Sequence, residues 1–377
     1  MRARPHVVCA PNAFKGTLTA AEAAQAMKRG ASAAGAAALG VPIADGGDGT
    51  LDVLLGAAGG AARVTRHTVT GPLGQPVTAR LGWVDDVTAV VELAEASGLR
   101  LLDAGHLEVL QATSRGTGEL VGAALDGGAG RVIVGVGGSA GVDGGAGMLQ
   151  ALGARLLDAD GDELALGGGA LPSLARLDLA GVDPRVRRVA IDVAVDVRNP
   201  LLGTDGAAPV FGPQKGAGPA EVALLEHGLG VLAHTAARDC GAAGLAAGPG
   251  AGAAGGAGYA LALLGARLVP GAALVCDTIG LDARIDGAGL VFTGEGRLDA
   301  QTASGKAPAE VATRARARGI ACVAIAGQVI DPLPHLFTAA YSLENIAGGA
   351  DARTEAAAHV ERAALLATTE FISATRS

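Results

Sequence analysis

The stretch HVVCAPNAFKGTLTAAEAAQAMKRGASAAGAAALGVPIAD, residues 6–45, decides the fold. Its apolar start, HVVCAP, is typical of a buried strand, and VPIA, which ends at residue 44, predicts the next strand. Between them, Thr19 and Glu22 match a capping box that predicts the start of a helix, and Gly35 predicts its end. Strand, helix and strand in this order indicate a mainly parallel sheet, in which ligands bind at the carboxyl ends of the strands.

The C-terminal part repeats this rhythm. GLVF (289–292) predicts a strand that ends at the loop TGEGRLD (293–299), and KAPAEVATRARARG (306–319) predicts a helix. ACVAIAG (321–327) predicts the following strand, and a last strand is expected near LFTAAYS (336–342). The loop TGEGRLD is therefore expected at the carboxyl edge of the sheet.

The middle of the chain has a different texture. RVTRHTVTGPLGQPVTARLGWV (63–84) alternates apolar and polar residues around turn signals, which predicts an antiparallel hairpin, and TAVVELA (88–94) predicts a further strand. GELVGAALDGG (118–128) then predicts a helix, and RVIVGV (131–136) predicts a strand.

This change of sequence pattern predicts two α/β domains, as the length of 377 residues also suggests. We expect a discontinuous domain of residues 1–62 and 287–377, interrupted by an inserted domain of residues 63–286.

Composition excludes several classes of protein. The net charge of −8, without a block of like charges, argues against a nucleic-acid partner. Residues 240–266 are uncharged but contain nine glycines and Pro249, so they predict a loop leading into a buried helix rather than a membrane span. The four cysteines show no CxxC pair and are expected as buried thiols in a reducing cytoplasm. They are Cys9, Cys240, Cys276 and Cys322.

The glycine-rich stretch RVIVGVGGSAGVDGGAGM (131–148) fits more than one motif. Gly135, Gly137 and Ala140 match the dinucleotide pattern GxGxxA, whereas the residues around Ser139 match the GxSxG elbow of serine hydrolases. Too many glycines follow for a prompt helix start, and no HGGG-type loop is evident for an oxyanion. Glycine amides with the Ser139 hydroxyl favour a phosphate site, and a tightly packed turn is the alternative.

Lysine is rare in this chain, at four of 29 basic residues. Lys15, Lys215 and Lys306 each adjoin glycine, whereas Lys28 falls on a predicted helix. A compact ammonium beside glycine is a common phosphate partner. Ala307 follows Lys306 where a Walker A motif needs Ser or Thr, so a phosphate site here would not be a standard P-loop.

Three loops bring carboxylates to predicted strand ends: ADGGDGT (44–50), DVAVDVRNPL (192–201) and TGEGRLD. Two carboxylates about 4 Å apart repel by about 4 kcal/mol at an effective dielectric near 20, so a cluster needs a cation or a shared proton. Mg²⁺ prefers oxygen ligands supplemented by water and phosphate, so it is the cation expected here. For each residue, the alternative is that its side chain caps a helix or stabilises a turn. The polar residues concerned are Asp45, Asp48, Asp192, Asp196, Asn199, Glu295 and Asp299.

Through these loops and their neighbouring segments, taken in order, the chain resembles the bacterial class I glycerate kinases over almost its whole length. The matching motifs are NAFKGTL, IADGGDGT, ATSRGTGEL, VGVGGSAGVDGGAGMLQALG, NPLLG, VFGPQKGA, FTGEGRLDAQTASGKAP and AIAG. The family more often has Asp-Ser at residues 12–13, Glu at residue 48 and Thr-Asn at residues 141–142. This chain has Asn-Ala, Asp and Gly-Val there, so Asn12 and Val142 receive no role by analogy.

The resemblance implies a flavodoxin-like (Rossmann-like) α/β domain with a parallel sheet, interrupted by a second α/β domain. It also implies ATP-dependent, Mg²⁺-dependent phosphorylation of D-glycerate in a cleft between the domains, with 2-phosphoglycerate favoured and 3-phosphoglycerate as the alternative. An NAD-dependent hydroxy-acid dehydrogenase and a non-catalytic sugar-acid-binding protein stay open as other classes. The sequence does not indicate an oligomeric state.

Phosphoryl transfer requires charge neutralisation and positioning, and on this ground we assign roles as hypotheses. Asp196 is the first candidate for the base, with Asp192 and Glu295 behind it, and Lys215 neutralises phosphate charge. Asp45 and Asp48 are expected to bind magnesium or its waters. The expected substrate- and nucleotide-binding residues are Lys15 (phosphate), Gly137, Gly138 and Ser139 (phosphate cradle), Arg297 (substrate carboxylate), Asp143, Asn199, Asp299 and Lys306.

Overall fold

The chain consists of two compact units. The computed structural model describes residues 5–103, 105, 107–299, 302, 306–330, 335–348 and 351–375. Unit 1 comprises Met1–Asp45, Asp52–Ala57 and Pro270–Ser377, and unit 2 comprises Gly46–Leu51 and Ala58–Val269. This division gives residues 270–286 to unit 1 and residues 46–51 and 58–62 to unit 2, where the sequence suggested otherwise. The domain boundaries expected from the sequence stay a prediction.

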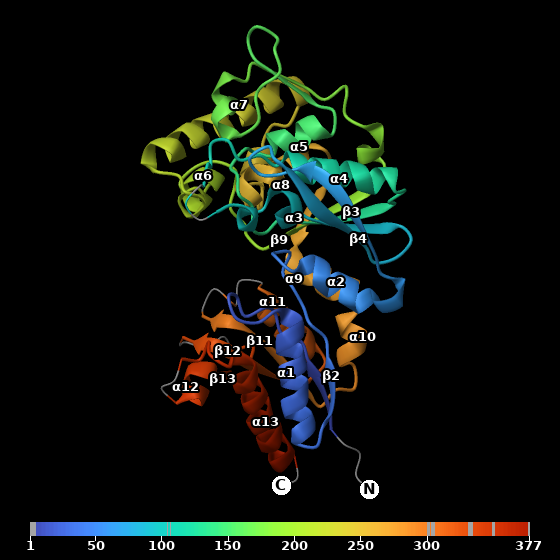
Figure 1. Ribbon diagram of the computed structural model, residues 1–377. Coiled ribbons are helices and arrows are strands. Elements are labelled where there is room, and N and C mark those ends of the chain that lie inside the picture. The colour runs from blue at the N-terminus through green and yellow to red at the C-terminus, as the bar shows by residue number, and fades with distance from the viewer. Residues whose placement is uncertain are drawn as a thin grey trace. The chain divides into compact units, whose positions relative to one another are not determined.

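Unit 1 is built on a five-stranded, wholly parallel sheet (Figure 1). In spatial order its strands are β13 (Ala339–Ser342), β12 (Ala321–Val329), β11 (Leu290–Leu298), β1 (His6–Cys9) and β2 (Ala37–Gly40). Its helices are α1 (Ala20–Ala33), α9 (Gly271–Thr278), α10 (Leu281–Ile285), α11 (Ala307–Ala317), α12 (Leu343–Ala347) and α13 (Ala356–Ala374). The mixed α/β class with a parallel sheet is thus confirmed.

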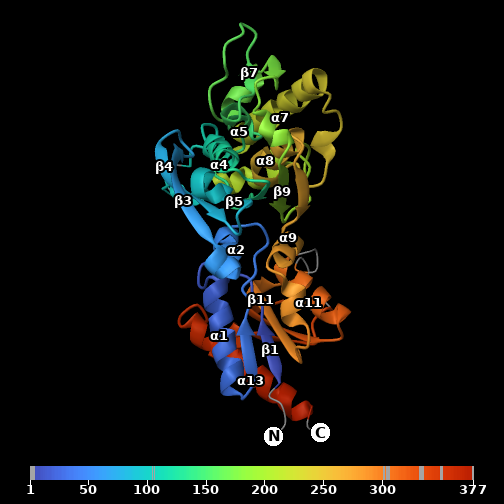
Figure 2. The same cartoon turned by 90° about the vertical axis from the view of Figure 1, so that its right-hand side faces the viewer.

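Helix α1 begins and ends as its sequence predicts. The Thr19 hydroxyl accepts the Glu22 N–H at 3.2 Å, and the Glu22 carboxylate accepts the Thr19 N–H at 2.8 Å, which completes the capping box. Helix α13 lies beside α1 (Figures 1 and 2). A Cβ on Gly30 would lie 2.1 Å from the Glu361 carbonyl oxygen, so glycine is what permits this close packing.

The strand predicted at VPIA is wrong by four residues, because β2 ends at Gly40. Pro42 has no N–H to contribute to a ladder, so the regular strand stops before it. The Val41 and Ile43 N–H groups still donate to Cys9 and Pro11 carbonyls at 2.8 and 3.0 Å. The chain therefore runs on beside β1 and reaches Asp45.

The loop predicted at TGEGRLD is also wrong, because β11 continues to Leu298 and pairs with β12 as far as Val329. The glycines mislead here: a Cβ on Gly294 would lie 1.8 Å from the Ile325 carbonyl oxygen, so glycine lets the two strands come close. Glu295 consequently projects from a strand, and Asp299 follows the strand's end.

Unit 2 contains a six-stranded mixed sheet and a two-stranded one (Figure 2). In spatial order the larger sheet has β10 (Arg267–Pro270), β9 (Ala190–Val195), β6 (Arg131–Gly135), β5 (Thr88–Glu92), β4 (Pro76–Trp83) and β3 (Arg63–Thr70). The smaller sheet pairs β7 (Arg155–Leu157) with β8 (Arg176–Asp178). Strands β3, β4 and β5 are antiparallel, as the alternating sequence predicts, whereas β5, β6 and β9 are parallel.

Helices cover the core of unit 2, which is formed largely by Val, Leu and Ala. They are α3 (Leu93–Ser97), α4 (Arg115–Asp126), α5 (Ala146–Ala151), α6 (Ala207–Phe211), α7 (Pro219–Cys240) and α8 (Ala253–Leu263). Helix α8 is the buried helix expected within residues 240–266. Helix α2 (Thr50–Ala58) is shared between the two units.

Among the described residues, no helix combines the length and apolarity that crossing a bilayer requires. All four cysteines are free, and three are buried as expected, whereas Cys240 is half-buried.

We expect Gly294→Ala to lower the free energy of unfolding by about 3 kcal/mol, because the new methyl group overlaps the backbone of β12. Gly122→Ala is the matched control, since Gly122 lies inside α4 with open space around it and should gain about 0.5–1 kcal/mol. Chemical denaturation of the two variants measures both effects. Equal stability of the two variants would contradict the close pairing of β11 and β12.

Candidate functional site

The carboxyl ends of three parallel strands of unit 2 lie level with one another. Glu92 ends β5 opposite Gly135, which ends β6, and Gly135 in turn lies opposite Ala194 of β9. The next residues of two of these strands lead directly to the loop 137–139 and to Asp196. The sheet therefore brings together two of the loops that the sequence singled out, at the edge where parallel sheets bind ligands.

The glycine loop that follows Asp45 packs onto the same strand ends. The Gly137 N–H donates to the Gly46 carbonyl at 3.2 Å, and a Cβ on Gly137 would lie only 2.3 Å from the Cα of Gly47. A Cβ on Gly46, which has φ +93°, would lie 2.6 Å from the Ala194 carbonyl oxygen. Both loops need glycine because backbone touches backbone here.

Lys215 lies beneath the 137–141 loop. Only 2% of the residue is exposed, and its ammonium donates to the Ser139 hydroxyl and to the Gly141 carbonyl, both at 2.6 Å. Burial lowers the pKa of Lys215 to about 7, against the attraction of the Asp143 carboxylate. The structure thus brings together Lys215 and Ser139, which the sequence proposed separately as phosphate partners.

Asp143 is 1% exposed and holds the same loop from within. Its carboxylate accepts the Ser114 N–H and hydroxyl, each at 2.8 Å, and the N–H groups of Gly145 and Gly147 at 3.0 and 3.3 Å. These contacts engage both oxygens and fix the turn that leads into α5. The position supports a structural role beside the expected binding role.

Glu92 is a buried site residue that the sequence analysis missed. Its two carboxylate oxygens accept the Gly49 N–H at 3.2 Å and the Leu51 N–H at 2.9 Å. Burial raises the pKa of Glu92 to about 7, and the neighbouring Asp48 carboxylate adds to the rise. The available signal was a single carboxylate inside the apolar predicted strand TAVVELA; in the structure β5 ends at this residue, at the edge of the sheet where ligands bind.

A chain of charges connects Asp48 to the interior of unit 2. Asp48 is exposed and lies 3.7 Å from a guanidinium nitrogen of Arg100, which also pairs with Glu95. Burial acts to raise the pKa of Glu95, but hydrogen bonds from Arg80 and Arg100 outweigh it and lower this pKa to about 2. Glu95 is therefore ionised at neutral pH and holds Arg100 beside Asp48.

The two aspartates of DVAVDVRNPL have different surroundings. Asp192 is not at the strand's end as expected, because it is the third residue of β9, where it is 1% exposed and pairs with Arg131 and Arg267 at 2.9 and 2.6 Å. Asp196 directly follows β9 and is exposed. Of the two, only Asp196 lies at the carboxyl end of the strand, the edge where parallel sheets bind ligands.

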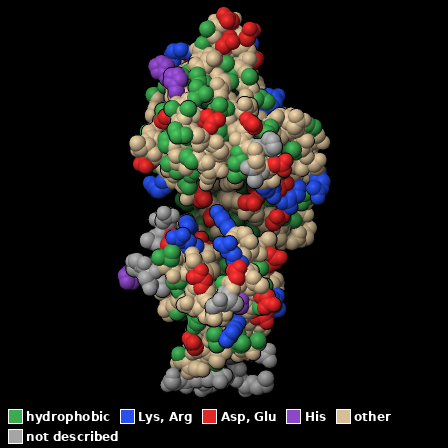
Figure 3. Space-filling view, turned by 60° about the vertical axis from the view of Figure 1, so that its left-hand side comes forward, with side chains coloured by type: hydrophobic (Ala, Val, Ile, Leu, Met, Phe, Trp, Pro, Cys, Tyr) green, Lys and Arg blue, Asp and Glu red, His purple; other side chains and the backbone are tan. Residues whose placement is uncertain are grey.

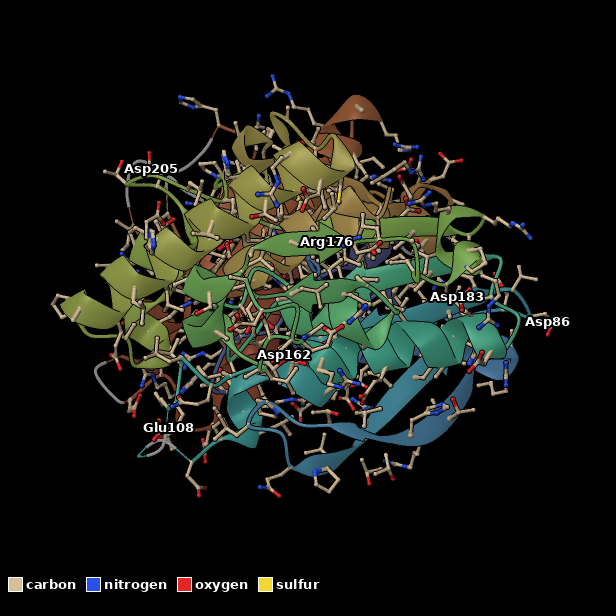
Figure 4. All side chains as sticks on the ribbon, turned by 90° about the horizontal axis from the view of Figure 1, so that it is seen from above. Asp86, Glu108, Asp162, Arg176, Asp183 and Asp205 are labelled. Carbon is tan, nitrogen blue, oxygen red and sulfur yellow. The ribbon has the colours of Figure 1, made fainter. Side chains whose placement is uncertain are left out.

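Asn199 stabilises its own loop. Its side-chain amide donates to the Asp205 carbonyl at 2.7 Å, and its backbone carbonyl accepts the Gly252 N–H at 3.0 Å. Figure 4 shows Asp205 at the periphery of the view from above. These contacts account for the polar side chain of Asn199 without a ligand.

Unit 1 has a polar group of its own at the carboxyl ends of β1 and β11, where the strand order reverses. Asn12 follows β1 and donates its side-chain amide to the Asp45 carboxylate at 2.9 Å. Glu295 accepts the buried Thr302 hydroxyl at 2.9 Å. Burial raises the pKa of Glu295, whereas the Lys306 ammonium opposes the rise and Asp45 adds to it.

The structure also describes the surroundings of the other predicted site residues of unit 1. Arg297 is 61% exposed and pairs with Asp299 at 3.2 Å, and Lys306 is the N-cap of α11. Lys15 is exposed in the turn after β1. Asp45 belongs to unit 1 and Asp48 to unit 2. Within the described ranges, no group of three or more His, Cys, Asp or Glu side chains is placed to hold a metal ion.

A separate pocket of unit 2 contains none of the predicted site residues. Arg176, Asp178 and Asp239 are among its lining, and Figure 4 shows Arg176 on the smaller sheet. Its two carboxylates are already paired with Arg176 and Arg238 at 3.2 and 2.6 Å. Figure 3 shows basic and acidic side chains intermixed on the face that it displays.

Comparison with known proteins identifies the family. A family model described as the glycerate kinase family matches residues 7–373. The chain belongs to the glycerate kinase family. A glycerate kinase of Bacillus subtilis (strain 168) is 44% identical over 373 residues, covering 95% of each chain, and a glycerate 2-kinase of Escherichia coli K12 is 45% identical over 336 residues, covering 86% of each.

A solved structure of a Salmonella typhimurium LT2 protein assigned as glycerate kinase 2 covers 100% of both chains, with 41% identity and a TM-score of 0.86. The protein is accordingly an enzyme of a family that phosphorylates glycerate, as the sequence motifs implied. The dehydrogenase alternative receives no support from these relatives.

We expect Lys215→Met to change how stability depends on pH. The pKa of Lys215 is about 7 in the folded protein, below the unfolded value of about 10.4, so the unfolded chain binds more protons between these values. The amine therefore adds to the free energy of unfolding as pH rises above 7. The difference between wild type and Lys215→Met should grow by about 2 kcal/mol from pH 7 to pH 9.

Chemical denaturation at pH 7, 8 and 9 measures this difference. Lys28→Met is the matched control because it removes a half-buried ammonium on α1 of unit 1. A constant offset between wild type and Lys215→Met over this range would show that the buried amine stays charged.

Proposed function

We propose that the enzyme transfers the γ-phosphoryl group of ATP, with Mg²⁺, to the 2-hydroxyl of D-glycerate. The observation that carries this proposal is the Gly137–Ser139 loop at the end of β6, fixed above the ammonium of Lys215. Glycine amides and a hydroxyl form a donor set that suits phosphate oxygens. The identity to a glycerate 2-kinase supports the 2-hydroxyl over the 3-hydroxyl.

The residues around Asp48 fit a magnesium ion. Asp48 and Glu92 are neighbouring carboxylates, and Mg²⁺ favours a few carboxylate oxygens together with water and phosphate. We propose Asp48 as a ligand of the ion or of its waters, and Asp45 as a second candidate. When bound, the ion would neutralise charge on the phosphates.

The chain's own groups would then carry the transfer. The hydroxyl oxygen of glycerate attacks the γ-phosphorus while Asp196 accepts the hydroxyl proton. The bond between the γ-phosphorus and the bridging oxygen of ADP breaks. Asp196 suits this role because of its position in the sheet. Ala194 of β9 is paired with Gly135 of β6. Asp196 and Gly137 each lie two residues beyond this pair, so both follow the same edge of the sheet. Lys215 and Ser139 stabilise phosphate charge.

Unit 1 residues complete the proposal. We propose Arg297 for the glycerate carboxylate, because a guanidinium binds a carboxylate with two hydrogen bonds, and Lys15 and Lys306 for phosphate charge. Glu295 is the alternative base, and Asp299 positions Arg297 through their ion pair. A cytoplasmic location, in keeping with four free cysteines, is part of the same proposal.

We expect ADP release that requires D-glycerate, ATP and Mg²⁺ together, and that stops when the ion is chelated. A coupled ADP-release assay over small hydroxy acids, with NAD(H) absorbance read in parallel, measures this. Phosphorus NMR of the product identifies the phosphorylated hydroxyl. Glycerate binding without turnover would instead favour a binding protein.

Asp196→Asn and Asp192→Asn should separate catalysis from stability. In Asp196→Asn, loss of the base should lower kcat by about 100-fold or more, and the exposed position of Asp196 should keep the effect on stability small. Asp192→Asn leaves two arginines without their buried partner and should lower the free energy of unfolding by about 3 kcal/mol, with kcat within a few-fold of wild type at low temperature. Steady-state kinetics and denaturation are measured for both, and a normal kcat in Asp196→Asn would transfer the role to Glu295.

A further inference from the structure

Asp48 lies in a turn that the protein fixes from several sides. The Gly46 carbonyl accepts the Gly137 N–H at 3.2 Å, and the buried Thr50 hydroxyl donates to the Gly47 carbonyl at 2.7 Å. These contacts hold the backbone before and after Asp48. The Gly49 and Leu51 N–H groups, which follow Asp48, need a further partner.

Glu92 supplies that contact. One of its oxygens accepts the Gly49 N–H at 3.2 Å and the other accepts the Leu51 N–H at 2.9 Å, so both ends of the carboxylate bind the start of α2. A carboxylate at a helix N-terminus is stabilised by the exposed N–H groups and the helix dipole. The side chain comes from the last residue of β5, so the rigid sheet fixes the turn.

The geometry points to Glu92 as a positioning residue for glycerate phosphorylation, which holds the 46–51 turn so that Asp48 faces the phosphate loop 137–139. This inference rests on the proposed role of Asp48, not on any contact of Glu92 with substrate. Glu92 is 1% exposed, and its two oxygens already accept backbone N–H groups. Its effect on the reaction is therefore indirect.

Glu92→Gln tests the inference at nearly constant shape. The amide keeps one acceptor oxygen but sets an NH₂ group against the second backbone N–H, so one of the two bonds is lost. Glu119→Gln is the matched control, because Glu119 of unit 2 also accepts a backbone N–H, from Thr70 at 2.7 Å, away from the glycine loops. Both substitutions replace a carboxyl group by an amide of nearly the same shape.

Two measurements are made on each variant. Hydrogen–deuterium exchange of the ligand-free protein, followed in peptides covering residues 44–54, should be at least 10-fold faster in Glu92→Gln and unchanged in Glu119→Gln. Steady-state kinetics should show kcat at least 10-fold lower and a higher Mg²⁺ concentration for half-maximal rate in Glu92→Gln, with KM for D-glycerate within about twofold. Glu119→Gln should stay within twofold of wild type.

Three outcomes overturn the inference: faster exchange with normal kinetics, slower turnover with normal exchange, and no change in either. If Glu92→Gln fails to fold, as judged by circular dichroism, Glu92→Asp takes its place, because it keeps the charge but falls one methylene short of the turn. The exchange result does not depend on activity. Absence of Mg²⁺-dependent activity in the wild type would contradict the proposed function, whereas the exchange result would still show whether Glu92 holds the turn.

Discussion

Contact between glycine backbones at the carboxyl end of β6 is the constraint on which the candidate site depends. Gly137 comes so close to Gly47 that a Cβ would lie 2.3 Å from its Cα, and Gly46 packs equally tightly on Ala194. Because no side chain separates them, the loop 46–49 and the loop 137–139 have one relative placement. That placement sets Asp48 near the amides proposed to bind phosphate.

Burial acts on the charged groups around these loops in a consistent way. It lowers the pKa of Lys215 and raises that of Glu92, both to about 7, since each charged form loses its hydration. Glu95 differs because hydrogen bonds from arginines replace the water it loses. Lys215 and Glu92 are therefore poised to respond when a charged ligand binds, whereas Glu95 keeps its charge and orients Arg100.

The sequence predicted what depends on neighbouring residues and failed where distant ones decide. The capping box of α1 and the hairpin of β3 and β4 follow from local pattern, and the ordered motifs identified the family. Asp192 and Asp196 looked alike, but the arginines that pair with Asp192 lie 61 and 75 residues away. Glu92 was missed because a carboxylate at the end of an apolar strand shows its partners only once residues 49–51 fold against it.

The surroundings of position 215 suit lysine better than arginine. The chain has four lysines among 29 basic residues, so arginine is its default cation. A guanidinium has five N–H donors and does not lose its proton in proteins, whereas the space below Ser139 provides two acceptors within 2.6 Å. An ammonium fits that number more closely, and because its pKa is about 7, a bound phosphate would favour its charged form.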